Sequence, residues 1–242
     1  MLLTLLNGHF TMEQVFAQIL AVLLVIFLIL PFHEWAHAFT ASCLGDKGIK
    51  ARGRLSLNPL SHIDPIGAVM LLLIGFGWAK PVPVDPRYFK RPKLGMAITA
   101  LMGPVANMVA ALAGLIIFNV FKYNFTDLLG SPVTETINGM NFITGYDYTV
   151  LYYFLSFYIS VNISLAVFNL IPIPPLDGSK VLFVFLPNKA VNFFYRYQQV
   201  FFIILFALMW GGALNGVLDY CTNWLYHGLD WLADLPFKPF VS

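Results

Sequence analysis

The sequence predicts an all-α polytopic membrane protein with about four transmembrane helices and a re-entrant or short β element on the cytoplasmic side. Hydrophobic residues make up 59% of the 242 residues and charged residues only 11%, whereas a soluble domain is about a quarter charged. The mean hydropathy is +0.75, and the apolar residues are gathered in runs long enough to cross a bilayer. A soluble enzyme is therefore excluded. The formal net charge of +2 is too small to indicate a nucleic-acid partner.

Four long apolar runs are predicted to be transmembrane helices. They cover residues 14–41, 94–121, 148–171 and 197–218. Each holds at least the roughly 20 residues that a helix needs to cross the hydrocarbon core.

Shorter elements are predicted between and after these spans. Residues 65–79 are too few for a comfortable crossing and have basic residues on both sides, which favours a re-entrant loop or hairpin. Residues 52–57 alternate with period two, which predicts a short strand that lines a cavity or lies at the interface. A short helix is expected over residues 179–186. The aromatic tail, with Trp224 and Trp231, fits an amphipathic interfacial segment.

The positions of the charges predict the orientation. Nine of the fourteen Lys and Arg residues lie between Lys47 and Lys93, and the positive-inside rule puts this stretch in the cytoplasm. The acidic segment 122–148 and the acidic tail after Leu218 belong outside. We therefore expect a multi-pass protein of the cell membrane whose first span ends at the cytoplasmic side. The absence of a linker or an internal repeat indicates a single domain over residues 1–242, with a catalytic core at about 14–186 and an additional span and tail at 187–242.

The motif His33-Glu34-Trp35-Ala36-His37 ends the first apolar run. On a helix, residues i and i+4 share a face, so both imidazoles can reach one zinc ion while Glu34 holds a water beside it. Ionisable side chains at membrane depth are costly, and three together indicate a metal or a polar cavity. The pattern predicts one catalytic Zn²⁺ bound by His33 and His37, with Glu34 as the general base.

A catalytic zinc needs a third protein ligand. Asp177 is the only acidic residue at membrane depth in the second half of the chain, and His62 and Asp64 are the other candidates. Two histidines and a carboxylate are a common ligand set among zinc peptidases. The alternative for Asp177 is a helix N-cap.

Several ordered motifs together resemble the site-2 protease family of intramembrane zinc metalloproteases. They extend from about residue 22 to residue 186 and comprise His33-Glu34-Trp35-Ala36-His37, Asn58-Pro59-Leu60, His62-Ile63-Asp64-Pro65-Ile66-Gly67, Ala79-Lys80-Pro81-Val82-Pro83-Val84, Gly103-Pro104-Val105-Ala106-Asn107 and Asn169 to Gly178. The resemblance implies zinc ligation by His33, His37 and Asp177, a catalytic Glu34, and a three-helix core with its site facing the cytosol. No PDZ or CBS module of the kind that some members carry is expected in this sequence.

Four further residues are predicted to act on the substrate. Asn107, an amide at mid-membrane, is the first candidate to stabilise the oxyanion, and Asn169 is the second and a predicted substrate-binding residue; for Asn107 the alternative is an interhelical hydrogen bond. Arg54 and Leu55, in the predicted strand, are expected to bind an extended substrate at its edge. His62 and Asp64 are assigned either to a substrate gate or to a structural turn before Pro65.

These observations predict hydrolysis of a peptide bond within or near a transmembrane segment. The family resemblance implies a single-pass transmembrane protein or a remnant signal peptide as substrate, with membrane lipid as the surroundings. The alternative is a zinc-binding transporter or a non-proteolytic homologue, against which the presence of Glu34 argues. A channel would require polar residues along several helices, and the predicted spans are polar only near the proposed site.

Overall fold

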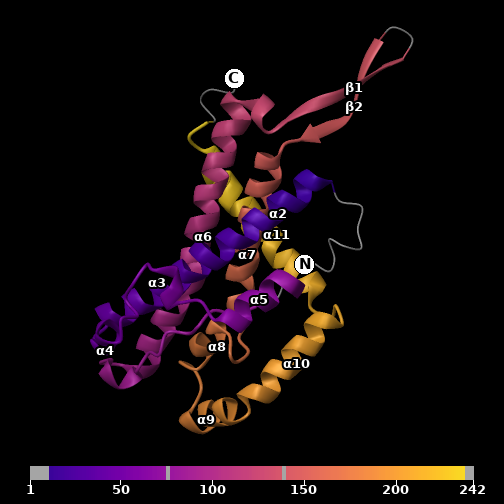
Figure 1. The fold of residues 1–242 in the computed structure, drawn as a ribbon. Coiled ribbons are helices and arrows are strands. Elements are labelled where there is room, and N and C mark those ends of the chain that lie inside the picture. The colour runs from indigo at the N-terminus through magenta and orange to yellow at the C-terminus, as the bar shows by residue number, and fades with distance from the viewer. Residues whose placement is uncertain (1–10, 75–76, 138–139, 238–242) are drawn as a thin grey trace.

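The computed structural model describes residues 11–74, 77–137 and 140–237, and over these residues the chain is mostly helical (Figure 1). The longer helices are α2 (Met12–Leu24), α3 (Leu30–Cys43), α5 (Pro65–Ile74), α6 (Pro92–Asn124), α7 (Val150–Asn169), α9 (Asn188–Arg196), α10 (Gln198–Trp210) and α11 (Asn215–Asp234). The shorter ones are η1 (Val25–Ile29), α4 (Gly48–Ala51), η2 (Pro59–Ser61), η3 (Pro86–Tyr88), η4 (Thr126–Leu128) and α8 (Asp177–Leu182).

The first predicted span is confirmed as one continuous helical rod. It consists of α2, η1 and α3, and residues 18–43 of it are apolar enough to cross a membrane. The middle part, η1, is a π-helical turn that ends four residues before His33. Insertions of this kind rotate the following turns relative to the preceding ones and occur often at functional sites.

The next two predicted spans are also confirmed, as α6 and α7. They contain 33 and 20 residues, and both pass the length and hydropathy requirement for a span. A hairpin of two antiparallel strands, β1 (Gly130–Ile137) and β2 (Met140–Tyr148), joins them and projects from the helices (Figure 1). We call this end of the bundle the hairpin end. The opposite end, where α4, α8 and α9 gather, is the site end.

The segment 65–79 leaves the site end and comes back to it. Its helix α5 has only 10 residues. After it, Ile63 and Ala79 form an antiparallel bridge, and Lys80 N–H donates to His62 O at 2.8 Å. Gly67 makes the close return possible, because a Cβ there would lie 2.1 Å from Trp78 O. The structure therefore agrees with the predicted re-entrant hairpin rather than a crossing.

The predicted strand at 52–57 is wrong. Residues 52–57 form a turn and irregular chain after the one-turn helix α4, which Gly53 ends with φ +68°. Gly53 N–H donates to Lys50 O and Arg54 N–H donates to Ile49 O, which is the hydrogen-bond pattern of a Schellman C-cap. The alternation of apolar and basic residues was thus overridden by a glycine that favours the left-handed conformation. The Ile63–Ala79 bridge supplies the short β element in this region.

The C-terminal part differs from the single span predicted at 197–218. Helices α9 and α10 are bent by 66°, and the described residues contain three candidate spans, or up to four if this bent pair counts as one. Gly211 and Gly212 end α10, and Gly212 has φ +73°. The predicted span therefore joins two separate helices, because this glycine pair stops the first of them.

The tail is a packed helix, α11, rather than a separate interfacial segment. Leu229 and Ala233 are buried together with residues of α6 and α7. Near the hairpin end, Asp234 accepts hydrogen bonds from Asn119 Nδ2 at 3.0 Å and Tyr123 Oη at 3.1 Å. Since α11 begins near the end of α7 and finishes near the end of α6, it runs parallel to α6 and antiparallel to α7 (Figure 1).

Candidate metal centre

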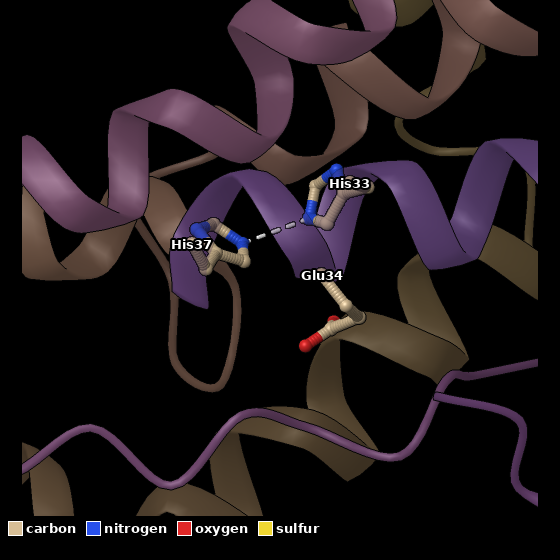
Figure 2. Close-up of side chains that lie close together, drawn as sticks. All are labelled: His33, Glu34 and His37. Carbon is tan, nitrogen blue, oxygen red and sulfur yellow. Dashed lines mark hydrogen bonds between the residues drawn. The ribbon is translucent and has the colours of Figure 1, made fainter. Parts of the chain in front are cut away.

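The two imidazoles of the α3 motif point to the same side of the helix (Figure 2). His33 Nε2 and His37 Nε2 lie 3.0 Å apart, and both side chains are buried, with residue exposures of 6% and 7%. The spacing i, i+4 produces this convergence because one helical turn separates the two residues. The sequence motif has therefore folded into a pair of nitrogen donors aimed at one point.

A backbone carbonyl of α6 orients His37. His37 Nδ1 lies 2.7 Å from Thr99 O, and because the carbonyl can only accept, the imidazole donates. The proton is thereby placed on Nδ1, and Nε2 keeps the lone pair that a metal requires. The fit between α3 and α6 depends on Gly103, where a Cβ would lie 2.5 Å from both imidazoles.

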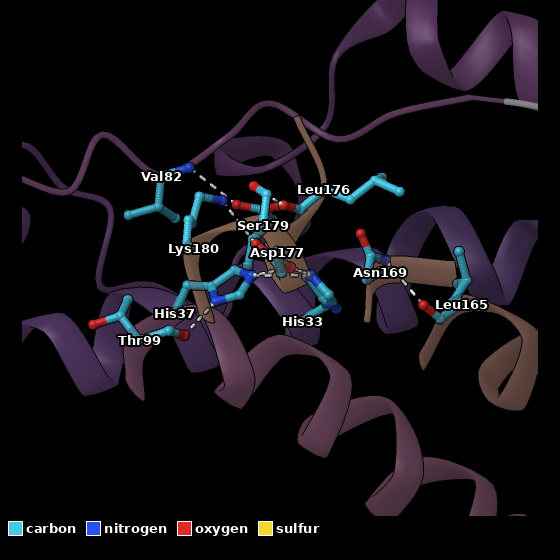
Figure 3. A network of polar contacts seen from close by, with 11 residues as sticks. His33, His37, Val82, Thr99, Leu165, Asn169, Leu176, Asp177, Ser179 and Lys180 are labelled. Carbon is cyan, nitrogen blue, oxygen red and sulfur yellow. Dashed lines mark hydrogen bonds and ion pairs between the residues drawn. The ribbon is translucent and has the colours of Figure 1, made fainter. Parts of the chain in front are cut away.

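Asp177 joins the two histidines from the other half of the chain. Its Oδ2 lies 3.2 Å from His33 Nε2 and 3.1 Å from His37 Nε2 (Figure 3). Asp177 is the first residue of α8, whose N-cap is Leu176, so the structure does not use it as the cap. The α7 end can approach α8 because residue 178 is glycine: a Cβ there would be 2.2 Å from Leu170 O.

The second oxygen of Asp177 is neutralised by a lysine. Lys180 Nζ lies 2.9 Å from Asp177 Oδ1. This ion pair stabilises the anionic form of the carboxylate, which is the form that binds a metal.

The three atoms that converge fit a tetrahedral zinc site. With metal–ligand distances near 2.0–2.1 Å, tetrahedral geometry places ligand atoms about 3.3 Å apart, and the observed separations are 3.0, 3.1 and 3.2 Å. Three lone-pair donors so close together repel one another unless a cation lies among them. The donor set is also one that zinc prefers.

Glu34 lies beside this triangle but is held differently. One of its carboxylate oxygens is within 4.8 Å of the imidazole nitrogens. Its Oε2 accepts a hydrogen bond from Val82 N–H at 3.0 Å, and Figure 2 shows the side chain directed away from the two imidazoles. Asp177 Oδ2 lies closer to both imidazole nitrogens, at 3.2 and 3.1 Å. Both carboxylates can thus reach the pair of imidazoles, and Asp177 is the nearer of the two.

Val82 belongs to an extended segment, residues 79–85, that we call the strap. Prolines at 81 and 83 have no N–H, so within Pro81-Val82-Pro83 only Val82 can donate to Glu34. The buried Arg54 guanidinium fixes one end by donating to Lys80 O at 2.7 Å and Pro81 O at 2.8 Å, and also to Ser61 O.

The other end of the strap is fixed by Asp46 and Arg52. Arg52 Nη2 donates to Pro83 O at 2.8 Å, and Asp85 N–H donates to the Asp46 carboxylate at 2.9 Å. Asp46 is fully buried. The strap is therefore held on both sides of Val82, which fixes the donor that contacts Glu34.

A cavity of about 770 Å³ adjoins these groups. The triad His33, His37 and Asp177 lines it together with Glu34, Asn169 and strap residues. Apolar side chains such as Phe202 complete the wall. The cavity thus brings a buried candidate metal site next to a space large enough for an extended peptide segment.

Comparison with known proteins identifies the family. The model of "Peptidase family M50" matches residues 21–211. The chain belongs to peptidase family M50, the family of site-2 proteases. It is 36% identical over 189 residues to YwhC of Bacillus subtilis (strain 168), covering 76% of this chain and 80% of that protein. It is 28% identical over 212 residues to Rip2 of Mycolicibacterium smegmatis, covering 85% and 70%.

Both relatives are named as candidate zinc metalloproteases. Rip2 of Mycobacterium tuberculosis (strain H37Rv) is also 28% identical, over 210 residues. No solved structure matches the chain. Membership in M50 makes this chain a zinc metalloprotease of the site-2 type, and the predicted family is confirmed.

The remaining predicted site residues of this M50 chain lie in different surroundings. Asn169 lines the cavity, and its Nδ2 donates to Leu165 O at 3.0 Å (Figure 3). Asn107 lies one turn beyond Gly103 on α6, is 1% exposed, and its amide atoms have no hydrogen-bond partner among the described residues. Arg54 and Leu55 do not line the cavity; Arg54 holds the strap, and Leu55 packs near Ala41. Their contact with substrate stays a prediction.

His62 and Asp64 take structural positions. His62 is fully buried, and its Nε2 lies 2.7 Å from Ser56 O. Asp64 Oδ1 accepts from the N–H groups of Ile66 and Gly67 at 2.9 Å, which caps the start of α5. Neither residue lines the cavity. The arrangement supports the structural-turn interpretation over the gate.

Sequence reasoning gave no role to four residues that shape this site. They are Thr99, Gly103, Lys180 and Val82. Gly103 and Val82 lie within motifs already noted, but Thr99 and Val82 act through their backbone atoms. A backbone contact of this kind leaves no signature in residue type.

Gly103→Val should abolish metal binding. The added side chain would occupy the position of both imidazoles, so purified protein should contain well below one zinc per chain, against one for the wild type. The measurement is metal content by mass spectrometry. Gly216→Ala is the control, because a Cβ there meets nothing within 4 Å. A Gly103→Val protein with full zinc content would contradict the packing of α6 against the imidazoles.

Proposed function

We propose that this chain is an intramembrane protease that hydrolyses a peptide bond within or near a transmembrane segment. The observation that carries the proposal is the convergence of His33, His37 and Asp177 within 3.2 Å of one another beside Glu34. This group lies at one end of helices long and apolar enough to cross a membrane. In the proposal, the three residues hold one catalytic Zn²⁺.

Glu34 is the proposed general base. When bound, zinc supplies Lewis-acid polarisation of the scissile carbonyl and of the attacking water. Glu34 accepts the proton of that water and passes it to the leaving amine. The hydrogen bond from Val82 N–H holds Oε2, so the carboxylate keeps one orientation while its other oxygen accepts the proton. Pre-positioning of this kind lowers the reorganisation needed in the transition state.

Asn107 is the proposed stabiliser of the tetrahedral oxyanion. Its buried amide makes no hydrogen bond with the described residues, so the interhelical-bond alternative has no partner there. A buried amide without hydrogen bonds destabilises the folded protein. A hydrogen bond from Asn107 to a substrate oxygen during the reaction would explain its presence at this position. Asn107 does not line the cavity. To contact the oxyanion, α6 or the bound substrate segment must move locally.

The proposed substrate is a single-pass transmembrane protein or a remnant signal peptide. A transmembrane helix hides its carbonyls in its own hydrogen bonds, so the segment must open before hydrolysis. The basic residues gathered between Lys47 and Lys93 lie toward the site end, which under the positive-inside rule supports a site that faces the cytoplasm of the cell membrane.

Glu34→Gln should leave zinc bound and abolish cleavage. The amide preserves size and can still face Val82, but it cannot accept the water proton, so the rate should fall at least about 100-fold. The test measures zinc content and cleavage of a panel of transmembrane peptides by purified protein in bicelles. Asp230→Asn on α11 is a control for the loss of one carboxylate. Equal activity of Glu34→Gln and wild type would rule out Glu34 as the base.

Arg54→Met should slow catalysis without releasing zinc. Loss of the guanidinium removes three hydrogen bonds to strap and loop carbonyls, so Val82 no longer holds Glu34 in place. We expect kcat to fall about tenfold with KM nearly unchanged, and Arg54→Lys to restore part of the loss. Arg87→Met is the matched control, since Arg87 is exposed and pairs only with Asp85 among the described residues. An unchanged kcat in Arg54→Met would contradict the role of the strap.

A further inference from the structure

A row of serines runs along one face of α7. Ser156, Ser160 and Ser164 recur every four residues on a helix that is apolar enough to cross a membrane. Asp219, Thr222 and Asn223 of α11 lie across from them, and the six residues line a groove of about 470 Å³. We call these six residues the polar groove. Polar side chains are thus not confined to the metal centre, contrary to the expectation from the sequence.

Most of the polar groups in this groove have no partner among the residues that the structure describes. Thr222 Oγ1 donates to Leu218 O at 2.8 Å. The side chains of Ser160, Ser164, Asp219 and Asn223 make no hydrogen bond or ion pair with any described residue, and all four residues are exposed. Serines in helices often bond to the carbonyl four residues earlier, and Ser160 and Ser164 do not.

Exposure of these groups has a cost at membrane depth. A carboxylate or an unpaired hydroxyl facing hydrocarbon is unfavourable, so such groups face water, protein or a polar ligand. Both helices continue past the groove in the bundle, since Leu229 of α11 is buried against Ile159 and Ile163 of α7. The groove is therefore suited to water or to a polar group of another molecule beside α7.

The groove and the cavity at the metal centre are linked by the lining residues of a cavity between them. A second cavity of about 430 Å³ shares Ser160, Ser164, Asp219 and Thr222 with it. That second cavity in turn shares Leu30, Gly77, Leu165 and Phe168 with the cavity at the metal centre. Residues of α2 and η1 border this route on one side and α11 borders it on the other. The groove, this second cavity and the cavity that holds Glu34 therefore follow one another along α7.

We propose that the polar groove binds the transmembrane helix of the substrate through a face that carries hydrogen-bond donors. The only charged group in the groove is Asp219, so a hydroxyl, amide or ammonium group complements it. Serine and asparagine side chains also compete with helical hydrogen bonds, so the feature that is bound also loosens the helix for hydrolysis. This inference rests on the proposed function and adds the substrate class to it.

The test uses two synthetic transmembrane peptides that differ in one face. Both are Leu/Ala spans of about 21 residues; one carries Ser, Asn and Lys every four residues and the other carries Leu at those positions. Binding to the full-length Glu34→Gln protein in nanodiscs is measured by fluorescence energy transfer, so that cleavage plays no part. We expect the polar-faced peptide to bind about fivefold more tightly, the size expected for a few interhelical hydrogen bonds.

Variants of the groove should remove this preference. Ser160→Leu with Ser164→Leu, and Asp219→Leu separately, should bind the two peptides equally, while Val217→Leu on an exposed part of α11 should keep the fivefold difference. Zinc content close to that of the parent shows that each variant is folded. A preference retained in both groove variants would overturn the proposal. The proposal would also be overturned if the groove variants bound both peptides as the parent does but no longer self-associated, because the groove would then bind a second copy of the chain.

The same peptides separate this inference from the proposed function. If the wild type cleaves both peptides at equal rates and Glu34→Gln binds both equally, the protease function stands and the groove proposal is wrong. If the polar-faced peptide binds selectively but wild type cleaves neither peptide, the groove binds polar helices and the proposed hydrolysis is contradicted for this substrate class.

Discussion

Asp177 at the start of α8 contacts both histidines of α3 in the interior of the protein. This contact joins residues 140 positions apart in the chain, and it puts a carboxylate against two imidazoles in a buried position. A buried cluster of polar and charged groups is stable only when each group is paired or hydrogen-bonded by its neighbours. Gly103 lets α6 approach, Gly178 lets the α7 end approach, and Lys180 compensates the second carboxylate oxygen. The strap then adds one N–H to orient Glu34.

The sequence alone predicted the helices and the chemistry that local patterns encode. Long uncharged runs have few alternatives to membrane helices, which is why α2–α3, α6 and α7 were predicted within a few residues of their bounds. The i, i+4 histidines needed only one helical turn to converge. The proximity of Asp177 was a chemical expectation, and the structure places it at 3.1 and 3.2 Å from the imidazoles.

Features that depend on distant contacts or on single glycines were not predictable in the same way. Gly53 converts an alternating segment into a capped helical turn, and Gly211 with Gly212 divides one apolar run into two helices. Thr99 accepts from His37 through its carbonyl and Val82 donates to Glu34 through its N–H; both are backbone groups, to which residue type gives no clue. Ser160 and Asp219 are far apart in sequence, and only the packing of α11 against α7 shows that they share a groove.

X-ray absorption at the zinc edge distinguishes a ligand set with Asp177 from one with Glu34. For the wild type we expect four nitrogen or oxygen ligands near 2.0–2.1 Å, two of them imidazoles. Asp177→Ala should lose zinc or one oxygen ligand, and Glu34→Gln should leave the spectrum of the wild type unchanged. A spectrum that changes in Glu34→Gln but not in Asp177→Ala would contradict the account, because Glu34 rather than Asp177 would then be the third ligand.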